Sequence, residues 1–338
     1  MRILLLIILV FTFIANIKGQ DTKASDTIAS AAIWKDISAF FLPPTEYKGA
    51  YGAYRSPLKF YDGHAVKTLK DWEKRRNEIF TRWNKMMGAW PPLLKDQQMK
   101  MLDSTRRDGF TQYRVQFYWT PDEQTEGYLL VPDGKGMKPA VITVFYEPET
   151  AIGWGRSDRT NLDFAYQLTK RGFVTLSIGT TEATKEKIFS LYYPNISNAQ
   201  VEPLSMLACA AANAWYALAK IPQVDSSRIG IMGHSFGGKW AMFASCLFNK
   251  FACAVWSDPG IVFDESRQDI NYWEPWYLGY YPKPWRNRGM ITEQNPAKGL
   301  YPKLVAEGYD LHELHALWLR GLFLFRADRK IRQNAGFP

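Results

Sequence analysis

The segment IGIMGHSFGGKWAMFAS, residues 229–245, constrains the fold of this chain more than any other stretch. An apolar run typical of a buried strand leads into a glycine-rich turn, and an apolar helical pattern follows. The turn, GHSFG at 233–237, matches the pattern G-x-S-x-G. Between a strand and a helix, this pattern holds a serine in a strained turn where larger neighbours would clash. We predict that Ser235 is a nucleophile; the alternative is an ordinary glycine-rich turn with a solvent-exposed serine.

The stretches on both sides of this turn alternate between apolar runs and helical patterns. PAVITVFY at 139–146 and FVTLSIG at 173–179 are continuous apolar runs, and residues 202–220 have the pattern of a long helix. Apolar strands that alternate with helices indicate a parallel sheet covered on both faces. We therefore predict the α/β class, with a mostly parallel, doubly wound sheet that is incomplete at its C-terminal end.

Composition changes along the chain divide it into segments. Residues 1–20 combine a basic residue, a short apolar run and then small or polar residues before the expected cleavage site, which is the layout of a secretory signal peptide. The following region contains Trp72, Ile79, Trp83 and Met86 at helical spacing. We predict a signal peptide at 1–20, a helical or irregular extension at 21–105, a main domain at 106–317 and a distinct tail at 318–338.

An insertion rich in aromatic residues and proline interrupts the main domain at about 259–309. Because sites in such sheets lie at the carboxyl ends of the strands, we expect this insertion to cap the site. The aromatic segment at 272–285 would form the cap, with Trp273, Trp276 and Tyr277 as one wall, and Trp273 and Trp276 would bind substrate. A purely structural clamp is the alternative.

A serine nucleophile needs donors for the oxyanion that forms during acyl transfer. One donor is expected to be the backbone N–H of Phe236, directly after the nucleophile. The second is expected from the loop after the first parallel strand, YEPET at 146–150. Glu147 in that loop either lines the site or is an ordinary loop residue.

The segments DSSRIGIMGHSFGGKWA (225–241) and DLHELHAL (310–317) resemble α/β-hydrolases, in particular exported bacterial esterases of the acetyl xylan esterase and glucuronoyl esterase kind. The resemblance covers roughly residues 138–317. It implies a secreted serine esterase that acts on carbohydrate-linked carboxylic esters through an acyl-enzyme, without metal or cofactor. Lys239 aligns with a substrate-contacting lysine of the glucuronoyl esterases, with a solvated helix residue as the alternative. Phe236 stands where these esterases have an oxyanion-stabilising arginine.

The acid and the base are harder to assign. α/β-Hydrolases order their triad as serine, acid, histidine. Asp258, which ends the strand after the predicted nucleophile, is the expected acid, and Asp328 is the alternative; a third interpretation makes both ordinary loop carboxylates. His315 is the candidate base, with His312 beside it, although both also suit packing or capping. In the resembled families the histidine follows the segment that matches 310–317, and here none does, so we expect impaired catalysis.

The tail at 318–338 departs from the resembled families, which continue with a strand beginning A-P-R-P. A DNA sequence that encodes MAPRPFLV can, when translated from one base later, encode WLRGLFLF, which is the amino-acid sequence at 318–325. We therefore interpret the tail as an out-of-frame reading.

The charge distribution and the cysteine content indicate which classes of partner to expect. Most of the formal net charge of +9 lies in the signal and the tail. The signal contains two basic residues, Arg2 and Lys18, and the tail contains five basic residues and one acidic residue. No basic patch with stacking aromatics remains, so we expect no nucleic acid partner.

The three cysteines form no metal-ligand pattern. We expect a secreted or periplasmic protein that acts on a small-molecule or carbohydrate ester and has no membrane contact after signal cleavage. A prolyl-oligopeptidase-like peptidase and an inactive carbohydrate-binding relic are the alternatives.

Overall fold

The computed structural model describes residues 34–35, 38, 45–50, 52–154, 161–180, 192–195, 197–260, 262–263, 278–279 and 291–319. The chain divides into two units, Met1–Tyr54 and Arg55–Pro338. The described part of the first contains a short 3-10 helix, Thr45–Tyr47. The expected signal peptide, Trp273, Trp276, Tyr277 and the tail beyond Leu319 lie outside the described residues.

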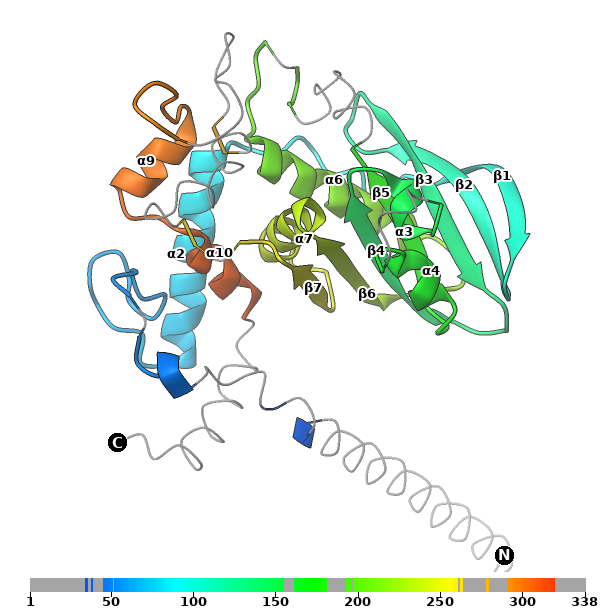
Figure 1. The fold of residues 1–338 in the computed structure, drawn as a ribbon, viewed down its shortest axis with the longest axis horizontal. Coiled ribbons are helices and arrows are strands. Elements are labelled where there is room, and N and C mark those ends of the chain that lie inside the picture. Colours follow the sequence, from blue (N-terminus) through cyan, green and yellow to red (C-terminus); the bar gives the residue numbers. More distant parts are fainter. Residues whose placement is uncertain are drawn as a thin grey trace, which may run out of the picture. The chain divides into compact units, whose positions relative to one another are not determined.

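The second unit is built on a seven-stranded sheet (Figure 1). Its strands are β1 (Lys100–Arg107), β2 (Phe110–Tyr118), β3 (Gln124–Pro132), β4 (Lys138–Phe145), β5 (Val174–Gly179), β6 (Val224–His234) and β7 (Ala254–Ser257). They lie in the order β1-β2-β3-β5-β4-β6-β7. The pairs from β5 to β7 are parallel, and those from β1 to β5 are antiparallel. The sheet is therefore more mixed than the sequence suggested, because a meander of three strands precedes the parallel part.

Helices cover both faces of this sheet, as predicted (Figure 1). On one face, the larger core joins β-strand residues such as Ile142 and Ile231 to α6 (Pro203–Leu218) and α7 (Phe236–Leu247). On the other, a smaller core joins Leu130 to α3 (Pro148–Ala151) and α4 (Phe164–Thr169). Every residue of α6 is buried, which agrees with its small and apolar sequence.

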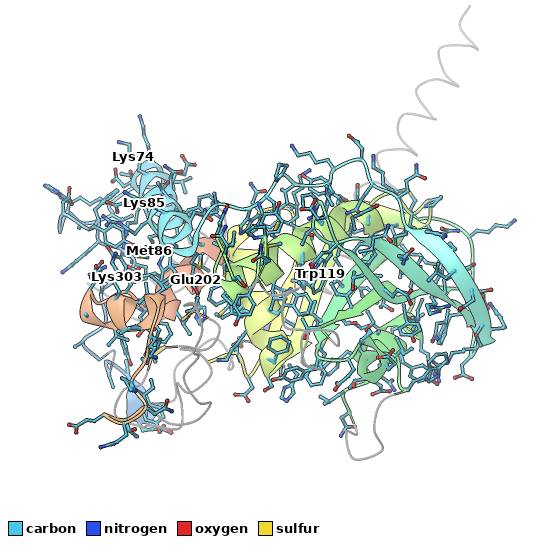
Figure 2. The ribbon with its side chains drawn as sticks, turned by 90° about the horizontal axis from the view of Figure 1, so that it is seen from above. Lys74, Lys85, Met86, Trp119, Glu202 and Lys303 are labelled. Carbon is cyan, nitrogen blue, oxygen red and sulfur yellow. The ribbon has the colours of Figure 1, made fainter. Side chains whose placement is uncertain are left out.

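The expected N-terminal helix is present as α2 (Leu69–Met87). Thr68 and Asp71 form a capping box that fixes its start. Of the residues noted at helical spacing, Trp72, Ile79 and Trp83 are buried, whereas Met86 is half-buried and Met87 completes the buried face. Lys74 and Lys85 are exposed on the outer side of α2 (Figure 2).

Two helices close the described part of the chain, α9 (Leu300–Ala306) and α10 (Leu311–Trp318). Asp310 caps α10 by accepting a hydrogen bond from the Leu311 N–H, and α10 lies beside α2 (Figure 1). The region 310–317 is thus a packed helix, as its sequence indicated.

Candidate active site

Ser235 lies at the tip of the turn between β6 and α7. Its backbone has φ 54° and ψ −114°, a left-handed conformation that is rare for a residue other than glycine. The Ser235 N–H donates a 2.7 Å hydrogen bond to the Ser257 carbonyl at the end of β7, and the side chain is exposed. The predicted position of Ser235, at the carboxyl end of a parallel strand and directly before a helix, is confirmed. The strand was expected to be central, but in the described sheet β6 lies next to the edge strand β7. The catalytic role of Ser235 stays a prediction.

The glycines around Ser235 allow three backbone segments to approach closely. A Cβ on Gly233 would lie 2.1 Å from the Gly237 carbonyl oxygen, and one on Gly237 would lie 2.0 Å from that of Val144. A Cβ on Gly238 would lie 2.4 Å from the Ser257 carbonyl oxygen. Real Cβ atoms do not approach this closely, so the turn requires glycine for packing.

The two segments expected to form the oxyanion hole lie side by side. The rings of Tyr146, directly after β4, and Phe236 are stacked with centroids 4.3 Å apart and planes at 16°. Glu147 is the N-cap residue of α3 and is half-buried. Phe236 is the first residue of α7, where the helix dipole favours a developing negative charge. The structure thus brings together the backbone of Phe236 and the loop that contains Glu147.

Asp258 and Lys239 both lie near the end of β7. Asp258 directly follows Ser257, is exposed and has φ 55°. Its carboxylate hydrogen-bonds no other residue that the structure describes. The Lys239 ammonium donates a 2.7 Å hydrogen bond to the Pro259 carbonyl. Lys239 therefore helps to hold the segment that presents Asp258, a contact compatible with either role predicted for it.

All four histidines of the sequence are described, and none hydrogen-bonds Ser235. Three of them contact other groups: His64 pairs with Asp62, His234 Nδ1 lies 2.9 Å from Ser257 Oγ, and His312 Nε2 lies 2.6 Å from the Arg55 carbonyl oxygen.

The structure does not bring His315 to Ser235. His315 Nε2 lies 2.6 Å from Met242 Sδ, and its ring lies 5.2 Å from that of Trp256. Met242 is seven residues after Ser235 along α7, which is about 10 Å at the helical rise. Burial, and to a lesser extent His312, lowers the pKa of His315 to about 4. These are the surroundings of a packing residue, the alternative that the sequence left open.

Sequence reasoning did not single out Ser257, and it named Tyr146 only as the first residue of the loop at 146–150. Ser257 accepts the Ser235 N–H through its carbonyl and contacts His234 through its hydroxyl. Tyr146 stacks on Phe236. Both directly end or follow a parallel strand next to β6, so the rule that adjacent strands end at one edge of the sheet would have placed them near Ser235.

The groups available at this edge are the exposed Ser235 hydroxyl, the exposed Asp258 carboxylate and the backbone dipoles at the start of α7. Among the described residues, no group of three or more histidine, cysteine, aspartate or glutamate side chains is arranged to hold a metal ion. The cysteines are unpaired, and burial raises the pKa of Cys209 to about 12, so its thiol is not a competing nucleophile at neutral pH. In the same part of the chain no helix is long and apolar enough to cross a bilayer.

Residues 210–305, which include the turn at Ser235, match the prolyl oligopeptidase family. No curated protein matches the chain.

Several solved structures with a similar fold are esterases by name. A glucuronoyl esterase from Solibacter usitatus has 17% sequence identity and a TM-score of 0.56 over 79% of this chain and 78% of that one. A glucuronoyl esterase from Teredinibacter turnerae has 19% identity and a TM-score of 0.54 over 78% and 69%. A putative acetyl xylan esterase from Bacteroides fragilis has 14% identity and a TM-score of 0.54 over 78% and 70%. The chain therefore has the α/β-hydrolase fold.

Proposed function

We propose that this chain is a secreted serine hydrolase of carboxylic esters, with carbohydrate-linked esters as its substrate class. The observation that carries the proposal is the strained, exposed Ser235 between the carboxyl end of β6 and the start of α7. A serine with only a structural role needs neither a left-handed backbone nor three neighbouring glycine positions at which a Cβ would clash. The esterase names of the structures with the same fold support the substrate class.

In the proposed reaction, Ser235 Oγ attacks the ester carbonyl, and its proton passes to a base. The oxyanion of the tetrahedral intermediate accepts hydrogen bonds from the backbone N–H of Phe236 and from the loop at 146–150. The alcohol leaves with a proton, and water then attacks the acyl-enzyme to release the acid and restore Ser235. Asp258, one residue beyond the carbonyl that holds Ser235, is the proposed acid of the triad.

The base limits the rate of this chain. His315 contacts Met242 and Trp256, and His234 contacts Ser257, so no imidazole receives the Ser235 proton in this conformation. Because triad members act as a unit, loss of the base is expected to cost about four orders of magnitude or more in kcat. We therefore propose a slow esterase whose remaining rate comes from Ser235 and the oxyanion donors.

Hydrolysis of an activated acetate ester tests the proposal. The Ser235→Ala variant is expected to lose the activity above background, whereas Ser104→Ala, which alters an exposed serine on β1, should keep it. Added imidazole should accelerate the unaltered chain more than the Ser235→Ala variant, because it can replace the missing base. Equal rates for the unaltered chain and Ser235→Ala would exclude Ser235 as the nucleophile.

A serine peptidase of the prolyl oligopeptidase kind is the second candidate, and the match over residues 210–305 favours it. The same turn and oxyanion donors serve peptide and ester bonds. Activated esters and peptide anilides with proline before the scissile bond separate the two. A Ser235-dependent preference for the anilide would identify a peptidase, and sugar binding without turnover of either would identify an inactive relic.

Export is part of the proposal and has its own test. Expression in a bacterial host with the native N-terminus is expected to give exported protein that begins near Gln20 or Asp21. N-terminal sequencing of this material checks the cleavage. Recovery of exported protein that still begins with Met1 would contradict a cleaved signal.

A further inference from the structure

Three arginines converge on two tyrosines between α2 and the segment before α10. The Cζ atoms of Arg55, Arg75 and Arg82 lie 5.1, 4.1 and 5.2 Å from the centre of the Tyr61 ring. Arg55 and Arg82 also lie 4.8 and 5.8 Å from the centre of the Tyr309 ring. We call these five residues the guanidinium cluster. Its two rings are themselves in edge contact, with centroids 5.5 Å apart.

The carboxylates within reach are engaged mainly by Arg75. Glu313 is fully buried and accepts hydrogen bonds from Arg75 (3.3 Å), the Tyr61 hydroxyl (3.1 Å) and Trp83 Nε1 (3.1 Å). Glu78 accepts a 2.6 Å hydrogen bond from Arg75. These contacts neutralise Arg75 and leave little acceptor capacity for the other two guanidinium groups.

Arg55 and Arg82 keep unused donors. Arg55 Nη1 is buried without a hydrogen-bond acceptor and lies 3.7 Å from Glu313 Oε1, while its Nη2 donates to the Glu307 carbonyl at 2.8 Å. Arg82 is exposed, and neither a hydrogen bond nor an ion pair joins it to any described residue. Two glutamates, Glu78 and Glu313, pair with Arg55 and Arg75, and the nearby Asp310 carboxylate accepts from the N–H groups of Phe263 and Leu311 instead.

We infer that the guanidinium cluster binds a small oxyanion, namely a carboxylate, phosphate or sulfate group, over Tyr309 between Arg55 and Arg82. A guanidinium that lies on an aromatic ring keeps its N–H edge available, and its planar fork matches two oxygens of such an anion. Partial burial strengthens the charge-assisted hydrogen bonds that result. The anion would supply the acceptor that Arg55 Nη1 lacks.

This site is separate from the proposed ester hydrolysis. It is formed by α2, the loop before it and the segment between α9 and α10, whereas Ser235 lies at the carboxyl ends of the parallel strands. The inference therefore stands or falls independently of Ser235.

Calorimetric titration of the full chain with inorganic phosphate, sulfate and acetate at constant ionic strength tests the site. Saturable binding is expected, and Arg82→Gln should weaken it about tenfold or more, as expected when one charge-assisted contact is lost. Arg82→Lys should weaken it less, because the charge stays and only the fork is lost. Lys74→Gln is the matched control: it removes an exposed charge from the outer side of the same helix (Figure 2) and should leave the affinity unchanged.

Binding of phosphate and sulfate but not acetate would identify a tetrahedral oxyanion as the ligand. Binding of all three anions would show that the site also accepts carboxylates. The inference is overturned by the absence of saturable binding in the unaltered chain. It is equally overturned if Arg82→Gln binds as tightly as the unaltered chain, or if Lys74→Gln loses as much affinity as Arg82→Gln. Circular dichroism verifies that each variant is folded before titration.

Discussion

Ser235 occupies a backbone conformation that costs about 1–3 kcal/mol in a residue with a side chain. The structure maintains it from both sides. The Ser257 carbonyl accepts the Ser235 N–H, and Gly237 packs against the Val144 carbonyl. The exposed hydroxyl at the strand end is therefore a consequence of how β4, β6 and β7 meet, and substitutions that separate these strands should displace it.

Gly237→Ala tests this packing at a single residue. The new Cβ would lie 2.0 Å from the Val144 carbonyl oxygen, so α7 must move away from β4. We expect a loss of about 1–3 kcal/mol in the free energy of unfolding, as in other overpacked sites, and loss of Ser235-dependent hydrolysis. Urea denaturation and the acetate ester assay measure both. Gly136→Ala has open space around the new Cβ but is strained by its φ of 90°, so it should lose stability and keep the hydrolysis; an active, fully stable Gly237→Ala variant would contradict the packing argument.

The partly buried His315 is expected to make the stability of the protein depend on pH. Its pKa in the folded chain is about 4, below the value of about 6.5 expected when unfolded, so the unfolded chain binds more protons between these values. The stabilisation from neutral His315 is complete above about pH 6.5 and is lost as the pH falls toward 4.

His315→Phe keeps a ring against Trp256 and removes the titration. We expect its free energy of unfolding to fall less between pH 6.5 and 4 than that of the unaltered chain, by on the order of 2 kcal/mol. Urea denaturation at both pH values measures this difference. The variant should also keep the Ser235-dependent ester hydrolysis; loss of that activity would show that His315 moves to act as the base.

At the scale of elements, the buried carboxylate of Glu313 joins α10 to α2. It is the common acceptor for Arg75, Tyr61 and Trp83. Glu313→Gln would leave the fully buried Arg75 with Glu78 as its remaining carboxylate partner. Removal of one member of a buried ion pair costs about 3–5 kcal/mol, and we expect a loss of this order in the free energy of unfolding.

Glu307→Gln provides the comparison for this variant. Glu307 is exposed and lies 4.0 Å from Lys303, one turn away on the same helix end. Such a pair contributes about 0.5 kcal/mol or less, so this variant should melt close to the unaltered chain. If Glu313→Gln is as stable as Glu307→Gln, the contact between α2 and α10 does not depend on the ion pair.

The sequence predicted the elements whose patterns are local. α2, α6 and the turn at Ser235 each follow from apolar spacing or a short motif. β1 did not, because KMLDSTRR has no apolar alternation and is mostly exposed. The contacts of His315 and the convergence of Arg55 and Arg82 on Tyr309 join residues far apart in the sequence, and no local pattern encodes them.

At the scale of the whole second unit, the two edges of the sheet differ in their protection against pairing with other chains. β1 carries several charged side chains along its length, which discourages edge-to-edge association. In the described part of the chain, β7 forms the other edge; it is short, and Val255 on it is 48% exposed. We therefore expect self-association to begin at β7.

Val255→Lys tests this expectation, because a lysine on an edge strand opposes the approach of a second strand. The side chain at this position is already exposed, so the substitution should leave the core intact. We expect the variant to stay monomeric at concentrations where the unaltered chain forms larger species, as measured by sedimentation velocity. Met101→Lys places the same charge on the exposed Met101 of β1, where charges already surround it, and should change little. If Met101→Lys suppresses association and Val255→Lys does not, association begins at β1 and the expectation for β7 is wrong.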